Sequence, residues 1–177
     1  MYTIVVDDFT IEKSVRTAGR GDLAATHEIY AHYVATSVAT FELVAPDADE
    51  WARRFDAIAE AGLPFVVAEL DGRVAGYAYC SPWKTRPAYR QTAEDSIYVA
   101  PWAAGHGLGG ALLDELLLRS SAAGVREILA VIADSGDPAS LVLHQKRGFT
   151  EAGRLRAVGF KQDRWLDTVL LQRSLVA

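Results

Sequence analysis

Four glycines fall within six positions, at residues 105, 107, 109 and 110. They follow an apolar run at 97–99 and precede a segment of helical periodicity at 108–123. Glycine lets the backbone approach a ligand closely, and the free N–H groups of a first helical turn attract anions. The cluster therefore predicts a strand–turn–helix unit that cradles a phosphate, formed by Ala104, Gly105, His106, Gly107, Leu108, Gly109 and Gly110. The alternative is a tight turn that only packs the helix against the strand.

A second strong local signal is Asp71-Gly72, which joins apolar runs at 65–70 and 73–80 and predicts a β-hairpin. The strands at 97–99 and 127–132 flank the helix at 108–123, so the right-handed crossover rule makes them parallel. A hairpin combined with such a crossover implies a mixed sheet with helices on both faces, an α/β fold. The other expected elements are a strand at 14–17, helices starting near 21–22 and 46–47, a helix at about 137–146, and strands at about 149–158 and 165–173.

The chain length of 177 residues fits one domain, with residues 1–12 expected as an N-terminal extension and 13–177 as a single domain. Eighteen Lys and Arg against 23 Asp and Glu give a net charge of −5, which opposes binding to nucleic acid or an anionic membrane. The single cysteine, Cys80, cannot form an intramolecular disulfide, and no Cys and His cluster has zinc-like spacing. With no signal peptide recognisable, these features predict a cytoplasmic protein without a metal.

The same glycines allow a second interpretation. Gly105-x-Gly107-x-x-Gly110 matches the dinucleotide-binding fingerprint, and Asp134 follows at about the distance expected of a ribose-binding acid. That fingerprint normally opens a doubly wound domain, whereas here it comes late, with too little chain after it for the remaining strands. A Walker-type phosphate loop is excluded because Ala111 stands where lysine is required.

The glycine turn also resembles the pyrophosphate loop of the GNAT superfamily, whose pattern is Gln/Arg-x-x-Gly-x-Gly/Ala. Here it reads Ala104-x-x-Gly107-x-Gly109, with a departure at the first position. Further segments are similar to the phosphinothricin and methionine-sulfoximine N-acetyltransferase group within that superfamily. They are Val15-Arg16-x-Ala18, Ile29-Tyr30-x-His32-Tyr33, Thr36-Ser37-x-x-Thr40-Phe41, Val67-Ala68-Glu69-x-Asp71-Gly72, Pro82-Trp83-Lys84-x-Arg86-x-Ala88-Tyr89, Leu143-His144-x-x-x-Gly148-Phe149 and Gly159-Phe160-Lys161-x-x-x-Trp165-x-Asp167.

The resemblance, which covers roughly residues 14–174, implies a sheet whose parallel strands splay apart to admit acetyl-CoA between 97–99 and 128–132. The pantetheine arm is expected against Ile97, Tyr98 and Val99, and against Asp137 and Ser140 on the following helix. Asp137 replaces the asparagine usual in relatives, and because its carboxylate cannot donate a hydrogen bond, it is better suited to capping that helix. The group also implies a homodimer.

The resemblance implies a catalytic role for three residues. Glu94 is expected as the general base, the N–H group of Val99 as the donor to the oxyanion, and His144 as the acid that protonates the thiolate. Without the resemblance, Glu94 is an ordinary solvated charge before a strand, and His144 is a histidine packed on its helix. Both interpretations remain open at the level of sequence.

The loop 81–92 carries cationic and aromatic residues suited to a small amino-acid carboxylate, chiefly Arg86, with Lys84 and Tyr89. Phe41 is expected to wall the same pocket. The alternative for the loop is a solvated basic surface. The sequence therefore predicts an acetyl-CoA-dependent N-acetyltransferase that modifies the α-amine of a small amino acid or analogue by direct transfer. The alternatives are a non-catalytic acyl-CoA sensor and, less favoured, a dinucleotide-dependent oxidoreductase.

Overall fold

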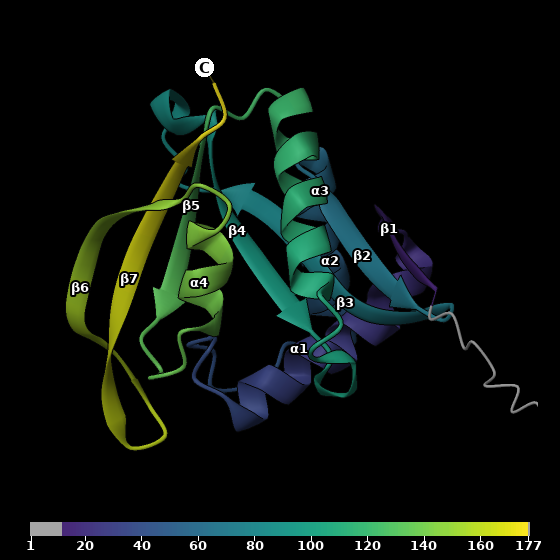
Figure 1. Cartoon of the computed structure of the whole chain (residues 1–177), viewed down its shortest axis with the longest axis horizontal. Helices are drawn as coiled ribbons and strands as arrows, with labels where there is room; N and C mark the ends of the chain where they lie inside the picture. Colours follow the sequence, from purple (N-terminus) through teal and green to yellow (C-terminus); the bar gives the residue numbers. More distant parts are fainter. Residues whose placement is uncertain (1–11, 177) are drawn as a thin grey trace, which may run out of the picture.

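The computed structural model describes residues 12–176, and these form one seven-stranded sheet covered by helices on both faces (Figure 1). The strand order is β1-β2-β3-β4-β5-β7-β6. The strands are β1 Lys13–Thr17, β2 Phe65–Leu70, β3 Arg73–Pro82, β4 Thr92–Val99, β5 Glu127–Ala133, β6 Thr150–Lys161 and β7 Arg164–Ser174, and the helices are α1 Leu23–Thr36, α2 Ala48–Glu60, α3 Leu108–Ala122 and α4 Ala139–Gln145. The α/β class and the predicted order of elements are confirmed. The predicted extension falls almost wholly on residues 1–11, which lie outside the described residues.

Turn residues define several of these boundaries. Asp71 and Gly72 adopt φ of 50° and 74° between β2 and β3, the left-handed pair that a two-residue hairpin turn requires. Asp47 is the N-cap of α2, and its Oδ1 accepts a hydrogen bond of 2.7 Å from the Glu50 N–H group. Gly62, with φ of 69°, follows the end of α2. Local chemistry that is visible in the sequence therefore sets these boundaries.

The two faces of the sheet have different cores. Helix α3 packs on β2, β3 and β4 through the fully buried side chains of Leu112, Leu113 and Leu116. Helices α1 and α2 cover the opposite face over an aromatic cluster, in which Tyr30 stacks on Trp51 with ring centroids 4.9 Å apart. Helix α4 lies beside α3, against β5 (Figure 1). The sheet is therefore buried on both faces around β2 and the middle of β3.

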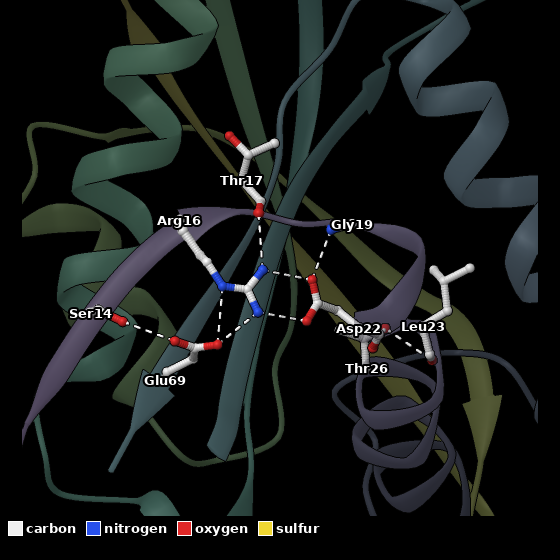
Figure 2. Close-up of polar contacts among 8 residues, drawn as sticks. All are labelled: Ser14, Arg16, Thr17, Gly19, Asp22, Leu23, Thr26 and Glu69. Atoms are coloured by element: carbon white, nitrogen blue, oxygen red, sulfur yellow. Dashed lines mark hydrogen bonds and ion pairs between the residues drawn. The ribbon is translucent and has the colours of Figure 1, made fainter. Parts of the chain in front are cut away.

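An ion-pair network fastens β1 to the start of α1 (Figure 2). Arg16 donates to both carboxylate oxygens of Asp22, at 2.8 and 2.7 Å, and also to Glu69 Oε1 on β2, at 2.7 Å from its Nη2. Asp22 is buried, and its carboxylate also accepts a hydrogen bond from the Gly19 N–H group. The hydrogen bonds from Arg16 lower the pKa of Asp22 although burial opposes them.

Strands β4 and β5 are parallel, as predicted, but they pair only over their first halves. The register runs from Thr92 opposite Glu127 to Asp95 opposite Ala130 and ends there. Beyond that point the two strands diverge (Figure 1). The prediction of a strand at 97–99 alone is wrong in extent, because β4 begins at Thr92. Glu94 therefore lies inside a strand rather than before one, since antiparallel pairing with β3 continues through Ala93.

Candidate active site

A cleft of about 780 Å³ opens where β4 and β5 diverge. It is bounded by β4 and β5, by the glycine turn and first residues of α3, by α4, and by α1 with the loop that follows it. Elements from most of the chain therefore contribute to one concave site. Of the predicted site residues, the cleft is lined by Phe41, Glu94, Ile97, Tyr98, Val99, Ala104, Gly105, Gly107, Leu108, Gly109, Gly110, Asp137, Ser140 and His144.

The second half of β4 turns backbone groups toward the cleft. Thr92 and Ala100 use their backbone groups to hydrogen-bond with the β3 side. Because backbone direction alternates along a strand, Ile97 and Val99 direct their N–H and C=O groups the other way, toward β5. Pairing with β5 has already ended, so the Val99 N–H group faces the cleft edge, while its carbonyl accepts a 2.6 Å hydrogen bond from the Tyr33 hydroxyl. An amide-bearing ligand can satisfy such strand-edge groups.

The glycine turn presents backbone at the other end of the cleft. Gly105 and Gly107 adopt φ of 81° and 76°, a region that residues with a Cβ avoid, and α3 begins directly after Gly107. The first N–H groups of this 15-residue helix are therefore suited to binding an anion without a basic side chain. His106 is not among the residues that line the cleft, and its Nδ1 lies 3.3 and 3.1 Å from the carbonyl oxygens of Ala103 and Ala104.

Glu94 lies on β4 in a half-buried position at the cleft wall. Burial, followed by the negative charge of Asp95, raises the pKa of Glu94, while the charge of Lys84 opposes the shift. A carboxylate with a raised pKa is a better match for accepting a proton from an amine near neutral pH. Its position and electrostatics both suit the role of a general base.

His144, on α4, is buried beside Asp95 of β4. Its Nε2 lies 2.8 Å from Asp95 Oδ2, and its Nδ1 lies 2.7 Å from the Ser140 carbonyl oxygen. The histidine ring also packs edge-on against Phe149, with centroids 5.0 Å apart. Burial lowers the pKa of His144, but the hydrogen bond and the charge of Asp95 together raise it above 6.5.

The residues that form the parallel pair and the glycine turn lie within a stretch of the chain that matches a family model. The model described as "Acetyltransferase (GNAT) family" matches residues 26–149. The chain belongs to the GNAT acetyltransferase family. It is therefore an acetyl-CoA-dependent N-acetyltransferase, and its mixed sheet is the GNAT fold. The doubly wound alternative is wrong, because within residues 12–176 the only parallel neighbours in the sheet are β4 and β5.

Several relatives are similar over nearly their whole length. The phosphinothricin N-acetyltransferase of Alcaligenes faecalis is 49% identical over 164 residues, which cover 93% of this chain and 83% of the relative. The L-methionine sulfoximine/L-methionine sulfone acetyltransferase of Pseudomonas paraeruginosa is 37% identical, covering 92% and 94%. A crystal structure of a phosphinothricin acetyltransferase from Sinorhizobium meliloti in complex with acetyl-CoA superposes with a TM-score of 0.88 at 45% identity, covering 92% and 88%.

The other predicted site residues of this GNAT chain lie on the β3–β4 loop and at the start of α4. Lys84, Arg86 and Tyr89 do not line the cleft; they lie on the exposed loop between β3 and β4, which contains a single 3-10 turn at Pro87–Tyr89. Asp137 Oδ1 accepts a 2.9 Å hydrogen bond from Ala139, the first residue of α4. It therefore satisfies a backbone donor at the helix start, although Pro138 occupies the N-cap position itself.

Three site features were not found by sequence reasoning. Asp95 lines the cleft beside His144, Thr40 lines it from the loop after α1, and Lys13 of β1 donates a 2.9 Å hydrogen bond to the His106 carbonyl in the glycine turn. The sequence held no usable signal for Asp95, because the strand that buries it was predicted only from residue 97 onwards. No local pattern indicates that Lys13 reaches the glycine turn 93 residues later.

Among residues 12–176, no group of three or more His, Cys, Asp or Glu side chains is arranged to hold a metal ion. In that same part of the chain, no helix has the length and apolar character needed to cross a membrane.

Proposed function

We propose that this GNAT enzyme acetylates the α-amine of a small amino acid or amino-acid analogue of the phosphinothricin or methionine sulfoximine type. The observation that carries the proposal is that Glu94, with its raised pKa, shares one cleft with the Val99 N–H group and the glycine turn. This arrangement combines a base, an oxyanion donor and an anion cradle. The names of the relatives from Alcaligenes faecalis and Pseudomonas paraeruginosa supply the substrate class.

The residues divide the reaction between them. Glu94 accepts a proton from the substrate ammonium group, directly or through water, which frees the nitrogen lone pair for attack on the thioester carbon. The Val99 N–H group stabilises the negative charge that develops on the carbonyl oxygen. The backbone of Gly107–Gly110 holds the pyrophosphate, and Ile97, Tyr98, Ser140 and Asp137 line the path of the pantetheine arm.

The cleft also has a wall suited to the acceptor. Phe41 lies at its rim, and the tyrosines at 30, 33 and 79 line it on the side of α1. Lys84 is close enough to Glu94 for its charge to lower the carboxyl pKa, although it lies outside the cleft lining. Lys84 and Arg86 of the loop are the cationic groups that we assign to the substrate carboxylate or phosphinate, with Tyr89 beside them.

The burial of the single cysteine supports direct transfer in a ternary complex over transfer through an acylated enzyme. Cys80 is the single cysteine of the chain and is fully buried. Burial raises the pKa of its thiol to about 12, so it is a poor candidate for an acyl carrier. Initial rates measured while both substrates are varied test this point. Intersecting double-reciprocal lines are the expected result, and parallel lines contradict direct transfer.

The acceptor is identified by incubating the enzyme with acetyl-CoA and a panel of amines, with product masses as the readout. The panel contains phosphinothricin, methionine sulfoximine, methionine sulfone and ordinary amino acids, each paired with its α-N-acetylated form as a control. Acetylation of the free amine but not of the blocked form is expected. If acetyl-CoA shifts thermal unfolding but no amine in the panel releases CoA, the non-catalytic acyl-CoA sensor is favoured instead.

We also propose that the enzyme is a cytoplasmic homodimer whose single domain spans 13–177. Exposed apolar side chains gather on the β6–β7 hairpin, where Phe160 packs on Trp165 with centroids 5.2 Å apart. Leu155 and Val158 are exposed on the same hairpin. Light scattering coupled to size exclusion tests this, with a dimer mass expected for the wild type and a monomer for Trp165→Asp.

A further inference from the structure

The contact between His144 and Asp95 is buried at the base of the cleft. Their side chains are 4% and 1% exposed, and 2.8 Å separates Nε2 from Oδ2. Asp95 is the last residue of β4 that pairs with β5, so the contact lies where the two strands begin to diverge. Both residues line the cleft. The pair therefore borders the reacting region without being part of the solvated surface.

The hydrogen bonds of the ring determine how many protons the pair holds. The Ser140 carbonyl can only accept, so the Nδ1 atom of His144 must carry a hydrogen. A neutral ring would then direct its Nε2 lone pair at the Asp95 carboxylate, 2.8 Å away, and two acceptors repel at that distance. A proton must therefore lie between the two atoms. Because imidazole is a stronger base than a carboxylate, this proton belongs to the ring, which is then protonated on both nitrogens and faces a carboxylate.

Among the described residues, no neighbouring side chain gives Asp95 a second hydrogen bond. On β3, Cys80 lies opposite Asp95, and its Sγ contacts Ser120 Oγ of α3 at 3.3 Å. Glu94 adjoins Asp95 on β4, and the positive charge of Arg147, which follows α4, lowers the pKa of His144. Asp95 Oδ1 has no hydrogen-bond partner among the described residues. Within residues 12–176, the histidine is therefore the one polar partner of a buried carboxylate.

We propose that Asp95 is a positioning residue for acetyl transfer, which holds His144 in the doubly protonated form and thereby keeps ready the proton that the departing thiolate takes up. This inference rests on the proposed function. It also changes the expectation for His144, because both ring nitrogens are already hydrogen-bonded and the ring does not act as an isolated acid. The proton-donating unit is the pair.

The acetyl-transfer step moves one electron pair to sulfur and one proton from the pair of His144 and Asp95. The amine nitrogen forms a bond to the thioester carbon, the carbon–sulfur bond breaks, and its electron pair remains on sulfur. Sulfur takes up one proton from the pair, which is left as neutral His144 facing ionised Asp95. That arrangement is unfavourable, so the pair regains a proton from the solvent. Glu94 and the product nitrogen each release one proton to the solvent. Over the whole turnover, an ammonium group and a thioester give an amide, a thiol and one proton.

The test is Asp95→Asn, which preserves the shape of the side chain. The amide N–H₂ group of asparagine can donate to Nε2, so the hydrogen bond persists while the ring becomes neutral. We expect kcat to fall about 100-fold, the order contributed by a general acid, with the KM for acetyl-CoA unchanged. We also expect the alkaline decline of kcat to move to lower pH. An unchanged kcat and pH profile would overturn the proposal.

A double-mutant cycle separates positioning from simple structural damage. If Asp95 acts through His144, the double variant Asp95→Asn/His144→Gln is no slower than His144→Gln alone. If the losses of kcat in the two single variants multiply in the double variant, the proposal is overturned. Ser120→Ala is the matched control, because it alters packing beside Cys80 without touching the pair. It is expected to lose stability while retaining kcat and its pH profile.

A readout besides activity comes from the ring nitrogens of His144, labelled with ¹⁵N and assigned with the His144→Gln variant. Both nitrogens are expected to carry a proton at neutral pH in the wild type, and only Nδ1 in Asp95→Asn. An unprotonated Nε2 in the wild type contradicts the proposal. A wild-type enzyme inactive on every amine overturns the proposed function itself, whereas an active wild type with an unaffected Asp95→Asn variant overturns only the role of Asp95.

Discussion

Lys161 of β6 donates a hydrogen bond of 2.8 Å to the carbonyl oxygen of Thr40, 121 residues earlier in the chain. Both residues are buried, and the Thr40 hydroxyl lies 3.0 Å from that of Tyr30. On the same strand, a Cβ at Gly159 would lie 2.2 Å from the ring of Phe41. The β6 strand therefore holds the loop after α1 in place, and this loop carries Thr40 and Phe41 to the acceptor side of the cleft.

Replacing this lysine should affect the acceptor more than acetyl-CoA. We expect Lys161→Met to raise the KM for the amine about tenfold, equivalent to about 1.4 kcal/mol, with the KM for acetyl-CoA unchanged. The free energy of unfolding should not fall greatly. Burial desolvates the Lys161 ammonium group, which lowers its pKa, and the uncharged methionine avoids this cost. Steady-state kinetics with each substrate varied measure both constants. Lys146→Met, at an exposed lysine after α4, is the control.

Glu94→Gln removes the proposed base while preserving size. We expect kcat to fall by about 100-fold or more. In the wild type, kcat/KM should rise with pH as the Glu94 carboxyl ionises. This rising limb of the pH profile should lie above pH 4.5, because burial and the charge of Asp95 raise the pKa of Glu94. The limb should be absent in the variant. Turnover and a pH profile identical to the wild type would exclude Glu94 from the mechanism.

The glycine turn is tested by Gly107→Ala, compared with Gly62→Ala. Both glycines have positive φ, 76° and 69°, and neither has an atom within 4 Å of an added Cβ, so each substitution introduces only backbone strain of about 1–2 kcal/mol. Both variants should therefore lose stability. Only Gly107→Ala should also raise the KM for acetyl-CoA, because Gly62 follows α2 and lies outside the cleft. Equal KM values would contradict a role of the turn in cofactor binding.

The pair of His144 and Asp95 also predicts how stability depends on pH. Because the folded pKa of His144 is raised, its stabilising contribution is fully present below its unfolded value of 6.5 and is lost as the pH rises through the folded value. Urea denaturation of the wild type and of Asp95→Asn measures this. The stability advantage of the wild type should be largest at acidic pH and shrink above pH 6.5. A constant difference across this range would contradict the prediction.

The Arg16–Asp22 pair has the opposite pH dependence. Because Arg16 lowers the folded pKa of Asp22, the stabilisation is present above the unfolded value of 3.8 and is lost as the pH falls through the lower folded value. We expect Asp22→Asn to destabilise the fold by about 1–3 kcal/mol at neutral pH. Asp56→Asn is the control, because its pair with Arg20 is largely exposed and exposed pairs contribute about 0–1 kcal/mol. Chemical denaturation checks both values.

The sequence by itself determined the features that depend on neighbouring residues. The Asp71-Gly72 hairpin, the glycine turn before α3 and the order of the elements follow from turn chemistry and periodicity, which act over a few positions. It also singled out Glu94 and His144, through a resemblance that extends over most of the chain. The start of β4 was misplaced, because polar residues such as Glu94 and Asp95 interrupt the apolar pattern of a strand that is held by its neighbours on both sides.

Only the tertiary structure decided which partners these residues have. The contact of Asp95 with His144 spans 49 positions, that of Lys13 with His106 spans 93, and that of Lys161 with Thr40 spans 121. Such contacts arise because folding brings distant segments to one cleft, and burial then requires each polar group to find a partner there. No local pattern encodes that choice. The sequence indicated the chemistry of the site, and the packing of β4, α4 and β6 determined how that chemistry is arranged.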